Sequence, residues 1–210
     1  MDTEIVAVIG VCAFLALWYG GGHLFNRRRG QRLFRWLEEG LDTLGGEREA
    51  GWLGSSASGT RVNVIHADPP FRRLEITMLL ANREIPVLWL VDHLRGKRDR
   101  LIIRATLRSP QRTEIVVHPT KRRTRQQENS WVRQEGPQGL SVAVRGPGSV
   151  RQVAALMPWL QTYAAHLQHF AWHKTDPHIH LQIEMGGMVT MSSEALLADL
   201  QAAIGGSDAH

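Results

Sequence analysis

An apolar run near the start of the chain is its most regular pattern. Residues 5–19 contain no charged or strongly polar side chain, and the run continues through three glycines to residue 25. A helix over residues 5–25 is about 31 Å long, which matches the roughly 30 Å hydrocarbon thickness of a bilayer. The pattern predicts a transmembrane helix there. A cleavable signal peptide is the alternative, but Asp2 and Glu4 stand where such peptides carry basic residues.

Arginines crowd the C-terminal flank of this run. Basic flanks stay in the cytoplasm, so we expect the N-terminus outside and the remaining chain inside, in the cell (inner) membrane. We also expect these side chains to face anionic lipid. They are Arg27, Arg28, Arg29, Arg32 and Arg35.

Residues 30–44 have the spacing of an amphipathic helix, which Gly45-Gly46 ends. Its apolar positions are Leu33, Leu37, Leu41 and Leu44. Two interpretations stay open. The helix either lies in the membrane interface, held by anionic lipid, or links the anchor to a domain on which it packs.

Between residues 51 and 145 apolar and polar positions mostly alternate, as in strands with one buried face. The clearest case is the apolar set Leu74, Ile76 and Met78. Turn signals separate the runs and no long helix lies between them, so an antiparallel sheet is predicted. Its strands are expected near 61–64, 73–80, 101–108, 114–118 and 139–145.

Residues 85–94 interrupt this alternation, because they are apolar on nearly every side yet too short to span a bilayer. A basic segment with Arg95, Lys97, Arg98 and Arg100 follows. One interpretation is a second membrane-touching element with a basic rim that faces anionic lipid. The other is a buried strand or short core helix followed by a solvated turn.

The period changes to that of a helix after Gly146-Pro147. An apolar stripe predicts a helix from about 147 to 173, with a kink or a new start at Pro158. A strand is expected at about 178–185. A last helix is expected at about 193–204, with a serine as its N-cap and glycines after its end.

These patterns predict an α+β protein. One N-terminal transmembrane helix precedes a mainly antiparallel β-sheet domain with two C-terminal helices packed on it. The expected boundaries are 1–26 for the anchor, 27–46 for a basic juxtamembrane amphipathic helix and 47–206 for a cytoplasmic domain. Such a domain buries a core without disulfides, and the single cysteine, Cys12, lies in the anchor.

Charge is distributed unevenly along the chain. All 25 Lys and Arg residues lie after residue 25, against 18 acidic residues there, which gives that part +7. Such a surface attracts phospholipid or nucleic acid. The densest run, 95–133, contains a polar stretch at 121–125 that is expected to be a loop. Because Trp131 is the only aromatic residue in this run, nucleic acid is unfavoured. Anionic phospholipid is the expected partner, and a protein partner is the other option.

Five histidines within fifteen residues raise the alternative of a zinc or other transition-metal site. If the helix reaches residue 173, His166, His169 and His173 share a helix face that is turned away from the apolar stripe. His178 and His180 share the polar face of the next strand, and packing the two apolar faces together points the two histidine sets apart. The pattern therefore favours solvent-facing histidines over a metal site. They are His166, His169, His173, His178 and His180.

No catalytic or cofactor motif is recognised. The serines at 55–58 do not form a nucleophile elbow, and residues 146–149 lack a phosphate-loop pattern. No cofactor is expected. The sequence favours a single-pass membrane-anchored interaction or accessory module over an enzyme. The alternatives are a metal-dependent enzyme using the histidines at 166–180, and a membrane-tethered nucleic-acid binder.

Overall fold

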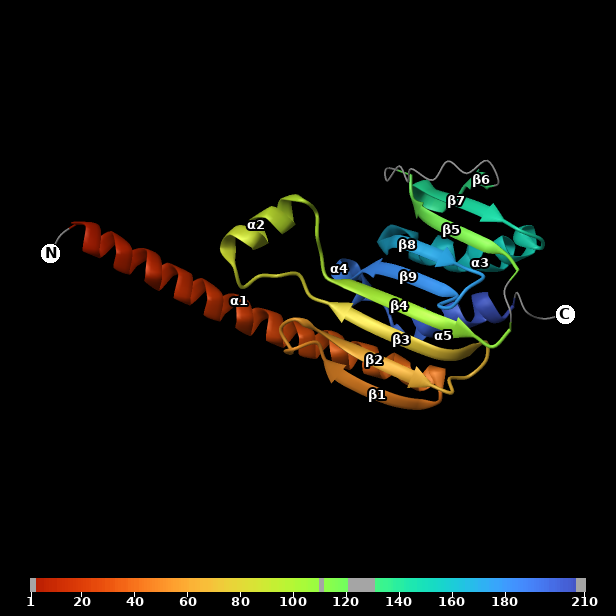
Figure 1. The fold of residues 1–210 in the computed structure, drawn as a ribbon, viewed down its shortest axis with the longest axis horizontal. Helices are drawn as coiled ribbons and strands as arrows, with labels where there is room; N and C mark the ends of the chain where they lie inside the picture. The colour runs from red at the N-terminus through yellow and green to blue at the C-terminus, as the bar shows by residue number, and fades with distance from the viewer. Residues whose placement is uncertain (1–2, 110–111, 121–130, 207–210) are drawn as a thin grey trace.

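The first helix continues without a break from the apolar run into the domain (Figure 1). In this computed structural model, which describes residues 3–109, 112–120 and 131–206, α1 is Thr3–Leu41. It is the one helix in those ranges that is long and apolar enough to cross a membrane, a property shared by anchors and signal sequences. The predicted loop at 121–125 lies outside the described residues.

The described residues form one nine-stranded antiparallel sheet in the order β1-β2-β3-β4-β9-β8-β5-β7-β6. An α+β class and an antiparallel sheet are therefore confirmed. The strands are β1 (Glu47–Trp52), β2 (Gly59–Ile65), β3 (Phe71–Leu79), β4 (Arg100–Leu107), β5 (Glu114–Pro119), β6 (Val132–Glu135), β7 (Leu140–Arg145), β8 (Leu167–Trp172) and β9 (Ile179–Glu184).

Alternation along the strands gives the sheet one apolar face. On β3, Leu74, Ile76 and Met78 are buried, whereas Arg73 is exposed. Ile76 pairs with Ile103 of β4, so the apolar positions of neighbouring strands fall on the same face.

Helices cover that face and leave the other open (Figure 1). The covering helices are the second half of α1, α3 (Ser149–Tyr163) and α5 (Ser193–Gly205). Leu33, Leu37 and Leu41 of α1 belong to the core cluster. Residues 30–41 therefore pack on the domain, as the linker interpretation expects. The boundary between residues 46 and 47 stays a prediction, although the core extends across it.

The helix predicted from 147 to 173 is wrong in its second half. The α-helix ends at Tyr163, a 3₁₀ turn (Ala164–His166) follows, and residues 167–172 are the strand β8. A register irregularity between Leu167 and His169 changes the alternation, so that Leu167 and Phe170 are both buried. Their spacing of three imitates a helical period, which is why the strand was missed.

The remaining helical elements are short and lie between the elements described above. They are α2 (Pro86–Leu94), α4 (Met185–Met188) and the 3₁₀ turns η1 (Asp42–Leu44) and η2 (Pro137–Gly139). The helix α2 contains no buried residue. The interpretation of residues 85–94 as a core element is therefore wrong.

Candidate membrane-docking site

The helix α2 exposes its apolar side chains. Val87, Leu90 and Leu94 are 70%, 50% and 77% exposed, and their spacing places them on one face. Pro86 begins the helix, where its missing N–H costs nothing. Gly96, with a φ of 69°, ends it, because its N–H donates to the carbonyl of His93. The result is a short helix with an uncovered apolar surface.

The helix α2 lies next to the C-terminal third of the predicted membrane span and contacts it through Trp89, on the side opposite to this apolar surface. The indoles of Trp18 on α1 and Trp89 on α2 are 5.6 Å apart between centroids. The Trp18 Nε1–H also donates to the Arg83 carbonyl over 3.2 Å. His23 and Glu84 form an ion pair at 2.9 Å when the histidine is protonated. Residues 83–89 therefore run alongside residues 18–25 of α1.

Glycine permits the close approach. A Cβ on Gly22 would lie 2.2 Å from the Arg83 carbonyl oxygen, whereas a Cβ on Gly20 or Gly21 would meet nothing within 4 Å. Only one of the three consecutive glycines is thus required for contact with the domain. The guanidinium of Arg83 then lies 5.4 Å from the ring centroid of Phe25, in a cation–π contact.

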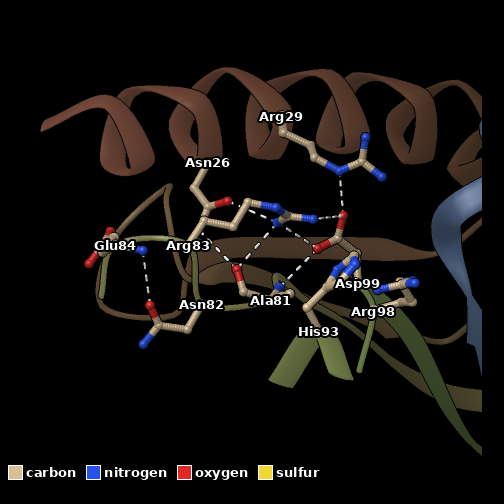
Figure 2. Close-up of polar contacts among 9 residues, drawn as sticks. All are labelled: Asn26, Arg29, Ala81, Asn82, Arg83, Glu84, His93, Arg98 and Asp99. Atoms are coloured by element: carbon tan, nitrogen blue, oxygen red, sulfur yellow. Dashed lines mark hydrogen bonds and ion pairs between the residues drawn. The ribbon is translucent and has the colours of Figure 1, made fainter. Parts of the chain in front are cut away.

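Just beyond the span, α1 is fastened to the sheet by the Asp99 cluster: Asn26, Arg29, Arg83 and Asp99 (Figure 2). Arg83 donates to Asp99 Oδ1 and Oδ2 over 2.9 and 3.3 Å, and Arg29 Nε donates to Oδ2. Arg83 also donates to Asn26 Oδ1 over 2.9 Å. The backbone N–H of Ala81 completes the shell at 2.9 Å.

Asp99 is ionised within this shell. Its burial would raise the pKa, but the hydrogen bonds from Arg83, Ala81 and Arg29 outweigh that effect and hold the pKa below its ordinary value. Asp99 is 2% exposed and faces two guanidinium groups. The cluster therefore carries one excess positive charge beside the predicted membrane surface.

More basic groups follow α2. Lys97 pairs with Asp92 at 2.7 Å, and the Arg98 guanidinium donates to His93 Nδ1 over 3.0 Å. A guanidinium has no acceptor, so His93 Nδ1 is the acceptor in this bond. Within the described residues, Arg98 has no carboxylate partner. Two adjoining cavities lie beside these residues. Apolar side chains line most of one, and polar or charged side chains line most of the other.

The residues predicted to face anionic lipid lie in two settings. Arg29 points to Asp99 and Arg100 is half-buried, so these two are turned at least partly to the protein. Lipid contact stays a prediction for the whole set. The exposed members are Arg27, Arg28, Arg32, Arg35, Arg95, Lys97 and Arg98.

The histidines are arranged differently from the prediction. His169 and His180 have ring centroids 5.6 Å apart, so the two sets do not point apart. The reason is that His169 lies on β8, beside β9, and not on a helix. Burial, Arg104 and His173 lower the pKa of His180. His178 Nδ1 accepts from the Leu107 N–H at 3.0 Å, and His166 packs near Gly187.

A hollow of about 580 Å³ on the open sheet face is lined by His173 and His180 with Arg73, Glu75 and Arg104. In the described part of the chain, no three His, Cys, Asp or Glu side chains are grouped so as to hold a metal ion. A metal-dependent enzyme therefore gains no support from this geometry.

Sequence reasoning missed the Asp99 cluster. Asp99 is one of few acidic residues in the basic run at 95–133, and its partner Arg29 is 70 residues away. A signal was nonetheless present, since a lone carboxylate among arginines is the expected centre of an ion-pair network. Which arginines it would pair with depends on the fold.

Comparisons with known proteins assign no family. No model of a protein family matches the chain, and no curated protein matches it significantly. Among solved structures, the crystal structure of the mycobacterial trehalose monomycolate transport factor A, TtfA, is similar at 10% identity with a TM-score of 0.41. The match covers 85% of this chain and 92% of that one. A likeness at this score does not establish a shared fold or function.

Proposed function

We propose that this protein is a single-pass, membrane-anchored interaction module whose domain docks on the inner leaflet through α2. The observation that carries the proposal is the apolar face of α2, exposed beside the membrane-spanning part of α1. Burying a Val or Leu side chain contributes about 1.5–3 kcal/mol, so three such side chains left in water would be a substantial cost. A bilayer at the level of Trp18 and Trp89 removes that cost.

The charge pattern supports the same arrangement. Aromatic residues at the level of the headgroups and basic residues just inside are typical of a cytoplasmic interface. Because the basic flank stays on the cytoplasmic side, the N-terminus lies outside and the domain inside. The helix-free face of the sheet then remains available to a protein partner, as an accessory subunit requires.

Cysteine labelling in intact cells and in inverted vesicles tests both the orientation and the docking. In a Cys12→Ala background, Val87→Cys and Val150→Cys provide a matched pair, because the two valines are 70% and 84% exposed. A membrane-impermeant maleimide is expected to label position 150 only in inverted vesicles. Position 87 is expected to stay unlabelled there until detergent dissolves the bilayer.

Two results would contradict the proposal. Labelling of position 150 in intact cells would reverse the orientation. Labelling of position 87 in inverted vesicles at the rate of position 150 would show that α2 is in water, and the docking would then be wrong.

A further inference from the structure

Two adjoining cavities lie beside α1, α2 and the loops on either side of α2, and Arg83 and Trp89 line both of them. The first is an apolar groove of about 490 Å³ whose other lining residues are Leu17, Trp18, Gly21, Gly22 and Phe25. The second is a polar recess of about 300 Å³ lined by Asn82, Asp92, His93, Lys97 and Arg98, among others. Both volumes lie within the range of small-molecule sites.

The polar recess is electrostatically suited to an anion. Arg83 lines the recess and belongs to the Asp99 cluster, in which two guanidiniums share one carboxylate. Lys97 is paired with Asp92. Arg98 donates to His93 Nδ1 (Figure 2). The recess therefore has more cationic than anionic groups at its wall. A phosphate there would receive charge-assisted hydrogen bonds.

The apolar groove has the complementary character. Trp18 and Trp89 form two of its walls, and the missing side chain of Gly21 leaves its floor open. It follows the membrane-spanning part of α1, so hydrocarbon is the medium around it. A soluble anion would occupy the recess alone and leave this groove without a ligand.

We propose that the two cavities together bind one anionic phospholipid. Its phosphate lies in the recess against Arg98 and Lys97, and one acyl chain lies in the groove across Gly21, alongside the two indoles. This inference rests on the proposed docking of α2. It goes further, because it names a class of lipid that is bound at a defined site.

Lipid retention by the full-length protein tests the site. The protein is purified in detergent, exposed to phosphatidylglycerol or phosphatidylcholine, and the bound lipid is counted by native mass spectrometry. We expect one phosphatidylglycerol per chain, held more tightly than phosphatidylcholine. Arg98→Gln should weaken this binding about tenfold, since it removes a charge-assisted hydrogen bond. Gly21→Leu should weaken it by filling the groove.

Each variant has a matched control. Arg95→Gln removes an exposed charge that does not line the recess, and Gly20→Leu adds a side chain beside the groove in open space. Both controls should retain lipid as the original protein does. If Arg95→Gln and Arg98→Gln lose equal amounts of bound lipid, the binding depends only on general electrostatic attraction, and the proposed site is wrong. Inorganic phosphate that binds without any retained lipid would overturn it as well.

Labelling of the cysteine at position 87 distinguishes failure of the lipid site from failure of the docking. If Arg98→Gln and Gly21→Leu retain lipid unchanged while the cysteine at position 87 stays protected, only the lipid site is wrong. If position 87 of the Val87→Cys protein, without either lipid-site variant, is labelled in inverted vesicles, the docking is wrong and the lipid site is wrong with it.

Discussion

Replacing Asp99 by Asn is expected to destabilise the protein by about 3 kcal/mol. The substitution keeps the shape of the side chain but removes the carboxylate that pairs with both Arg29 and Arg83, and Asp99 is 2% exposed. Two partly buried guanidiniums would then repel each other without compensation. Urea unfolding of the full-length protein in detergent micelles, followed by tryptophan fluorescence, measures the loss.

Asp92→Asn is the matched control. It removes the carboxylate of an ion pair with Lys97 that is far more exposed, so the expected loss is below about 1 kcal/mol. Equal losses for the two variants would show that the Asp99 cluster is an ordinary surface contact.

The same residue gives an acid dependence with a defined sign. Because the pKa of Asp99 in the folded protein lies below its ordinary value of 3.8, the ionised carboxylate contributes stability above that pH. This contribution is lost as the pH falls from the ordinary pKa through the folded-state pKa. The difference in stability between the original protein and Asp99→Asn should therefore shrink below about pH 4.

Gly22→Ala is expected to detach the loop before α2 from α1. The new Cβ would lie 2.2 Å from the Arg83 carbonyl oxygen, so the loop must move and the bond from Trp18 to that carbonyl is lost. Overpacking of this kind costs about 1–3 kcal/mol. Hydrogen exchange measured by mass spectrometry should speed up over residues 81–99.

Gly20→Ala controls for the change of residue type, because a Cβ there meets nothing within 4 Å. It should leave exchange over residues 81–99 unchanged. If Gly22→Ala leaves it unchanged too, the contact between α1 and residues 83–84 is not made in the membrane.

Local patterns anticipated much of this fold. The alternation of Leu74, Ile76 and Met78 predicted the buried face of β3, and the spacing of Leu33, Leu37 and Leu41 predicted the helix that packs on it. Each of these signals depends on neighbours within a few residues, and a long, regular period is hard to mistake.

The remaining features depend on contacts that are distant in sequence. The irregularity between Leu167 and His169 replaced the strand period with a spacing of three, which concealed β8. The Asp99 cluster joins Arg29 to a residue 70 positions away. For residues 85–94 composition indicated an apolar element, but only the position of α2 next to Trp18 shows that it lies outside the domain core.

Immersion depth at Leu94 tests the docking of α2 most directly. A spin label is placed on Leu94→Cys or, as a control, on Val132→Cys of β6, in a Cys12→Ala background and in liposomes; the two side chains are 77% and 67% exposed. Docking predicts that oxygen, which concentrates in lipid, relaxes the label at position 94 more than a water-soluble nickel chelate does, and that the order is reversed at position 132. If the nickel chelate relaxes the label more than oxygen does at both positions, α2 is in water and the docking is contradicted.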